Sequence, residues 1–85
     1  MINIVLNSTD CIETVLPSIE VAMDAGDVCF LQNINYLGAF EIVALTLLVM
    51  ATNLKDAGTG IIHHAKRGFQ LIGVDEHGLN RTLVA

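Results

Sequence analysis

Basic residues are scarce in this sequence of 85 residues, which contains four Lys or Arg against nine Asp or Glu. The first of the four is Lys55, so every charged side chain before it is acidic. A protein that binds phosphate backbones needs clustered Lys and Arg, and the sequence therefore argues against nucleic acid as a partner. A basic protein surface suits such an acidic chain better.

Charged residues of either sign make up only 15% of the chain, there is a single Pro, and 53% of residues are hydrophobic. This composition excludes a disordered, charge-rich chain and predicts one compact domain spanning 1–85. A domain of this size is marginally stable, because it buries only about 60–65% of the surface that its unfolded chain exposes. Apolar residues left outside the core are therefore informative.

Cysteine is limited to Cys11 and Cys29, and the N-terminal stretch has neither a basic region nor a long apolar run. We therefore expect no secretory signal, a cytoplasmic location and reduced thiols. A disulfide between the two residues is the alternative.

The β-branched run from Ile2 to Leu6 predicts a strand, and the polar cluster after it predicts a helix start. Asp10 and Glu13 have the spacing of a capping box. Pro17 lacks a backbone N–H, so the helix either begins near Thr14 or kinks.

Further segments alternate in the same way, which is the pattern of an α/β protein with helices packed against a central, mostly parallel sheet. After a glycine stop at Gly26, these segments are a central strand over Val28–Leu31 that is expected to be buried on both faces, a long helix over Phe40–Ala57, a strand over 60–64, a short helix over Lys66–Val74 and a terminal strand over Thr82–Val84.

The long apolar helix is close to membrane-spanning length. Glu41, Thr52 and Asn53 argue against a span, as does the absence of basic residues on its N-terminal flank. We therefore expect it to belong to a soluble domain.

Helical spacing separates the apolar side chains of this helix into two sets. Ala44, Leu47, Leu48, Ala51 and Leu54 form the set expected to pack on the sheet. Ile42, Leu45 and Val49 lie on the side of the polar residues, where they would form an exposed strip that invites a partner. The alternative is that a neighbouring element covers these three residues.

From Ser8 to Glu76 the chain resembles the STAS domain, the module of anti-sigma factor antagonists and sulfate-transporter tails. The stretch DVCFLQNINYLGAFEIVALTLLVMATNLKDAG is similar to the strand, loop and helix that carry the family's Asp-Ser-Ser-Gly-Leu type motif, which falls here on Phe40–Ala44. In regulatory members a serine or threonine at this helix start is phosphorylated by a partner kinase. Glu41 and Ile42 occupy the two serine positions, so the resemblance carries over no phosphorylation site.

Glu41 permits the hypothesis that a fixed carboxylate stands where the phosphate would, stabilised by the helix dipole. The simpler interpretation is an ordinary glutamate that favours a helix N-terminus.

Chemical sites are not indicated by the sequence, and we expect no catalytic residue, cofactor or metal. His63 and His64 are adjacent on a predicted strand and would point to opposite faces, with His77 distant in sequence. The acidic neighbours of Cys11 and the buried position expected for Cys29 disfavour reactive thiolates.

These observations predict a non-enzymatic, STAS-like regulatory module that binds a protein partner through the start and outer face of the central helix. A kinase, an anti-sigma factor or another signalling protein is the expected partner, and a homodimer is left open. The alternatives are an accessory STAS-type subunit of an ABC lipid transporter and a small enzyme or metal-binding protein. The predicted binding residues are Asn35, Phe40, Glu41, Ile42, Leu45 and Val49.

Overall fold

A computed structural model of the chain describes residues 1–57 and 68–85, with side-chain environments described for residues 1–51 and 68–85. Within these ranges the protein has a small α/β fold, with a four-stranded mixed sheet and two α-helices. The prediction of an α/β protein is therefore confirmed. In chain order the elements are β1 (Ile2–Val5), α1 (Ile12–Ala25), β2 (Val28–Gln32), the 3-10 helix η1 (Ile34–Tyr36), α2 (Ala39–Ala57), β3 (Gln70–Val74) and β4 (Asn80–Val84).

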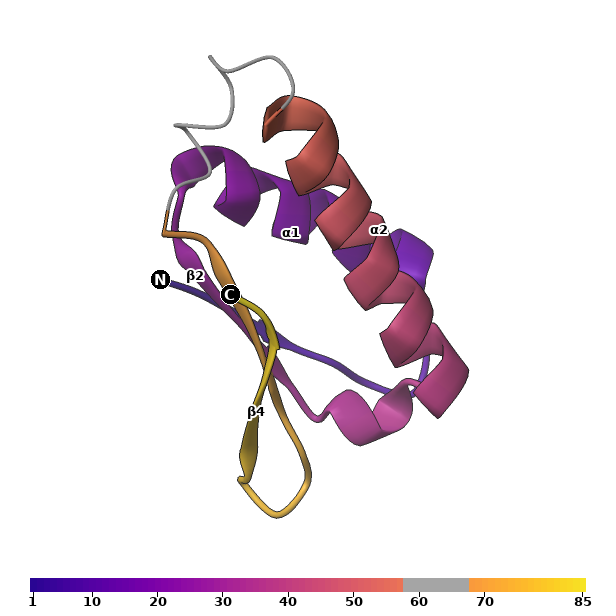
Figure 1. Ribbon diagram of the computed structural model, residues 1–85. Helices are drawn as coiled ribbons and strands as arrows, with labels where there is room; N and C mark the ends of the chain where they lie inside the picture. The colour runs from indigo at the N-terminus through magenta and orange to yellow at the C-terminus, as the bar shows by residue number, and fades with distance from the viewer. Residues whose placement is uncertain (58–67) are drawn as a thin grey trace.

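The strands lie in the order β1-β2-β3-β4. The first two pairs are parallel, and β4 runs antiparallel to β3. Both crossovers step in the same direction along the sheet, so the right-handed rule for such connections puts both helices on one face. Figure 1 shows α1 and α2 together on that face, and no helix of the described ranges on the other.

The hydrophobic core fills the space between the two helices and the sheet. α2 contacts both α1 and β4. The fully buried side chains of this core include Cys29, Leu31 and Leu71 from the sheet, Val15, Ile19 and Met23 from α1, and Leu45 and Val49 from α2.

The start of α1 differs from the prediction. Its N-cap is Cys11, whose backbone N–H donates to the Thr14 hydroxyl at 2.9 Å. Asp10 instead accepts a hydrogen bond from the backbone N–H of Asn7 at 2.8 Å, so the capping box predicted for Asp10 and Glu13 is wrong. The helix begins before Pro17 and contains it, and it ends at Gly26 with φ of 64°, as the glycine predicted.

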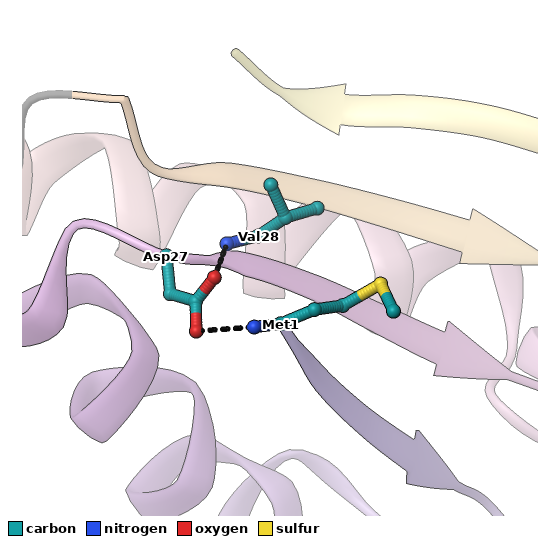
Figure 2. Close-up of polar contacts among 3 residues, drawn as sticks. All are labelled: Met1, Asp27 and Val28. Carbon is teal, nitrogen blue, oxygen red and sulfur yellow. Dashed lines mark hydrogen bonds and ion pairs between the residues drawn. The ribbon is translucent and has the colours of Figure 1, made fainter.

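Asp27 ties the start of β1 to the start of β2 (Figure 2). Its carboxylate accepts from the Met1 ammonium at 2.6 Å and from the Val28 backbone N–H at 2.7 Å. The hydrogen bond from Met1 and, to a smaller extent, the one from Val28 lower the pKa of Asp27 below its ordinary value. The contact fixes the beginnings of two neighbouring parallel strands.

β2 is central, as predicted, but it is fully buried only on the helix side. Cys29 and Leu31 are fully buried, whereas Val28 and Phe30, which alternate with them, are half-buried. The sequence predicted burial on both faces, and this is wrong because no helix of the described ranges covers the second face.

The prediction of a short helix over Lys66–Val74 is wrong, because Gln70–Val74 is the strand β3, parallel to β2. The strand predicted over 60–64 lies outside the described residues. The predicted terminal strand is confirmed as β4, although it begins earlier, at Asn80.

A tight loop joins β3 to β4. The carboxylate of Asp75 accepts from the backbone N–H groups of His77 at 2.9 Å and Leu79 at 3.0 Å. Gly78 adopts φ of 77°, a left-handed conformation that glycine tolerates without a steric penalty.

Candidate docking surface

The orientation of α2 is the reverse of the one that its sequence pattern predicted. Leu45 and Val49 are 0% and 1% exposed, and Ile42 is partly buried against the same core. They therefore cannot form the exposed strip predicted for them. Conversely, Leu47 and Leu48, expected to pack on the sheet, are exposed.

Thr46 explains why the polar side of the helix can face inward. Its hydroxyl donates to the backbone carbonyl of Ile42 at 2.8 Å, so the side chain is satisfied within the helix while half-buried. Because this hydroxyl is hydrogen-bonded within the helix, burying it avoids the free-energy cost of an unpaired polar group. A threonine of this kind therefore does not indicate which side of the helix faces water.

The outer face of α2 carries a row of exposed apolar side chains. Phe40 is 93% exposed and Leu47 is 60% exposed, and Val43 and Met50 are exposed as well. Steps of three, four and three residues place all of them on one side of a helix. We call Phe40, Val43, Leu47 and Met50 the α2 strip.

The segment before α2 has buried side chains that pack into the core and exposed side chains between them. Asn33 adopts φ of 60° at the end of β2, and the following η1 buries Ile34, while Leu37 is buried after it. Asn35 and Tyr36 lie between these anchors and are exposed. Two buried apolar residues thus hold the loop in place while its polar and aromatic side chains face outward.

Of the predicted binding residues, Asn35, Phe40 and Glu41 are exposed at the start of α2. Ile42, Leu45 and Val49 belong to the core side. Sequence reasoning missed Val43, Leu47 and Met50. Their helical spacing from Phe40 was visible, but the helix is apolar on both sides, so the spacing alone did not decide which side faces the sheet.

Charge around the α2 strip has one sign. Glu41 is the one charged residue between Ala39 and Ala51, and the charged residues of α1 are Glu13, Glu20 and Asp24. All four of these carboxylate side chains are exposed. A hydrogen bond from the side chain of Cys11 and one from the backbone of Glu13 lower the pKa of Glu13, so this carboxylate stays ionised. The helix residues whose side chains are described, 12–25 and 39–51, therefore combine exposed apolar side chains with negative charge.

The thiols do not form an obvious reactive site. Burial, aided by the negative charge of Asp27, raises the pKa of Cys29 to about 11. Cys29 is thus held in the protonated form, which is a poor nucleophile. Both cysteines are free, and Cys11 is partly exposed.

No cluster of three or more His, Cys, Asp or Glu side chains able to hold a metal ion occurs among the residues whose side chains are described. His77 is exposed and lies 3.5 Å from the Glu76 carboxylate. His63 and His64, the other histidines considered from the sequence, lie outside the described residues.

Neither helix of the described ranges is long and apolar enough to cross a membrane. Comparisons of the chain with protein-family models, with curated proteins and with solved structures find no match.

Proposed function

We propose that this chain is a non-enzymatic protein–protein interaction module, of a STAS-like regulatory kind, that docks a partner through η1 and the α2 strip. The observation that carries the proposal is the exposure of Phe40, which leaves 93% of a large aromatic side chain in water at the start of α2. Burying one such side chain stabilises a complex by about 1.5–3 kcal/mol.

Continuity of the exposed surface supports the proposal. Single exposed apolar residues are common on proteins, whereas contiguous apolar patches mark interaction sites. The α2 strip runs over three turns of one helix, and the exposed Tyr36 precedes it. Tyr is also one of the residue types most enriched among binding hot spots, and Tyr36 is exposed.

Charge complementarity favours a basic partner with an apolar patch of its own. Among the helix residues whose side chains are described, 12–25 and 39–51, the charged groups are all exposed carboxylates, so Lys and Arg on the partner would speed association and fix its orientation. The same carboxylates would repel an anionic lipid surface. A protein partner is therefore favoured over a membrane.

A photo-cross-linking experiment in the native cell tests the docking surface. A photoreactive phenylalanine analogue replaces Phe40 in one version of the chain and Val21 in another. Val21 is a matched position, because it is 62% exposed on α1 but lies outside the α2 strip. We expect one dominant adduct from position 40, and none from position 21.

The decisive measurement is whether the cross-linked adduct at position 40 depends on other residues of the α2 strip. Leu47→Glu should abolish the adduct at position 40, and Val21→Glu should preserve it, because only Leu47 lies in the strip. Both side chains are exposed, so the free energy of unfolding of each variant should lie within about 0.5 kcal/mol of the wild-type value. Equal adducts from the two positions, or an adduct that survives Leu47→Glu, would rule out the strip as the docking surface. Binding to lipid vesicles instead would also count against the proposal.

The regulatory part of the proposal rests on Glu41 and on the identity of the captured protein. Glu41 lies in the first turn of α2, where the helix dipole stabilises a carboxylate. If its charge stands in for a phosphate, Glu41→Gln and Glu41→Ser should change affinity for the captured partner several-fold. Equal and negligible effects would leave Glu41 as an ordinary helix N-terminal residue. Capture of a kinase, an anti-sigma factor or another signalling protein would support a regulatory role.

A further inference from the structure

The sheet has a second face, opposite the helices, and its strand residues can be assigned from the alternation of each strand. Ile2, Ile4, Cys29 and Leu31 belong to the core side. Their neighbours along β1 and β2 therefore point to the other side. The pairing register extends this assignment across β3 and β4. The residues of the open face are Asn3, Val5, Val28, Phe30, Gln32, Gln70, Ile72, Val74, Asn80 and Thr82.

None of these ten residues is charged, although the chain has a formal net charge of −5. Val5, Val28, Phe30, Ile72 and Val74 are apolar, and the others are neutral polar residues. Val5 is 63% exposed, and Phe30 and Ile72 are half-buried. The open face is thus a neutral, partly apolar surface on an acidic protein.

Val74 is the most buried residue of the open face. It is 7% exposed, yet it does not belong to the cluster of buried residues between the helices and the sheet. It pairs with Asn80 at the end of the β3–β4 ladder, on the open side. Val74 is therefore a nearly buried apolar residue on the open side of the sheet.

Parallel strands make an uncovered face unusual. Sheets built from parallel strands are normally covered on both faces, whereas antiparallel sheets often leave one face to water. Here β1, β2 and β3 are all parallel, and the described helices cover one face only.

We infer that a second copy of this chain covers the open face, so that two sheets pack face to face in a symmetric dimer. A two-fold axis brings the same patch of each copy together, so the patch has to be compatible with itself. The open face meets this condition because it has no charge. The helix surface formed by residues 12–25 and 39–51 does not, because its exposed carboxylates would face carboxylates. The two sheets would lie about 10 Å apart, with the helices of each copy on the outside.

The area of the open face determines how tightly the two copies are expected to bind each other. Four strands about 4.8 Å apart, each about 17 Å long, give a small footprint by the standards of protein interfaces. We therefore expect a reversible dimer whose population rises with concentration. This surface is separate from η1 and the α2 strip, so dimerisation and partner docking can succeed or fail independently.

Sedimentation equilibrium over a wide concentration range tests the inference. The mass should rise from 9.1 kDa towards twice that value, 18.2 kDa, and no further. Val5→Lys and Thr82→Lys place a positive charge on the open face at exposed positions of the two edge strands. Each should shift the dissociation constant at least tenfold towards monomer, although each makes the net charge less negative.

Val43→Lys is the matched control, since it puts the same charge on the α2 strip and should leave the dimer intact. Thermal unfolding confirms that each variant is folded, and two independent open-face variants keep the test valid if one of them does not fold. A monomer at every concentration, assemblies larger than a dimer, or a dimer lost in Val43→Lys but kept in both open-face variants would overturn the inference.

Discussion

Gly73 of β3 lies directly beneath the side chain of Ile34 in η1, and there is no room for a side chain between them. A Cβ at Gly73 would stand 2.8 Å from Cδ1 and 3.2 Å from Cγ2 of Ile34, and 3.3 Å from Cδ1 of Leu83. The close approach lets Ile34 pack on the sheet and thereby positions the loop that leads into α2.

Gly73→Ala should therefore destabilise the protein by about 1–3 kcal/mol, the usual cost of overpacking a core. Ile34→Val removes Cδ1, the atom nearest to the added methyl group, and costs about 0.5–1.5 kcal/mol alone. Denaturant unfolding of the double variant should show less destabilisation than the sum of the two. Gly38→Ala is the control, because a Cβ there meets nothing within 4 Å. Strict additivity would contradict the close contact.

Leu45 and Leu47 provide a direct test of which side of α2 faces the core. Leu45→Ala should lower the free energy of unfolding by about 2–5 kcal/mol, because it leaves a cavity among fully buried side chains. Leu47→Ala should change it by no more than about 0.5 kcal/mol, because Leu47 is exposed. Urea titrations of the two variants measure both values, and the opposite order would reverse the orientation of the helix.

The two thiols should react at very different rates in the folded protein. Cys11 is partly exposed, whereas Cys29 is fully buried and its pKa is raised to about 11. A thiol reagent at pH 8 should modify Cys11 rapidly and Cys29 only as the protein unfolds, which mass spectrometry with peptide mapping can resolve. Comparable rates would show that β2 is not protected.

Cys29 also predicts a loss of stability at high pH. Above about pH 8.5 the thiol ionises in the unfolded chain, while in the folded chain it stays protonated up to about pH 11. The folded state then binds more protons, so its stability falls as the pH rises through this window. Replacing Cys29 by Ala should reduce that alkaline slope in thermal unfolding, although the variant is less stable at neutral pH. An unchanged slope would contradict a buried, neutral thiol.

The contribution of Asp27 to stability should depend on pH in the opposite direction, and in the acidic range. Its pKa is lowered in the folded state by the hydrogen bonds from the Met1 ammonium and the Val28 N–H, so its contribution is present above about pH 4 and is lost as the pH falls through the folded pKa. Asp27→Asn should be less stable than the wild type at pH 7, and the difference should shrink below pH 4. A difference that stays constant on acidification would show that the carboxylate charge contributes nothing.

The open face and the α2 strip depended on the sheet order and on the orientation of α2, neither of which follows from local patterns. Periodicity located α1, β2 and α2 correctly, because each has a clear apolar run bounded by turn residues. It failed for β3, because Gly73 interrupts the apolar residues of the short segment Gln70–Val74 and the segment lacks the apolar–polar alternation of a strand.

The sequence by itself determined the α/β class, the acidic character of the first half, the glycine stop at Gly26 and the extent of the long helix. These features depend on composition and on contacts within a few residues, which the order of amino acids specifies directly. Tertiary structure alone decided that Leu45 and Val49 face the core and that Phe40 and Leu47 face outward. α2 carries apolar side chains on both of these sides, so its orientation is decided by packing on α1 and the sheet, with the Thr46 hydroxyl hydrogen-bonded within its own helix.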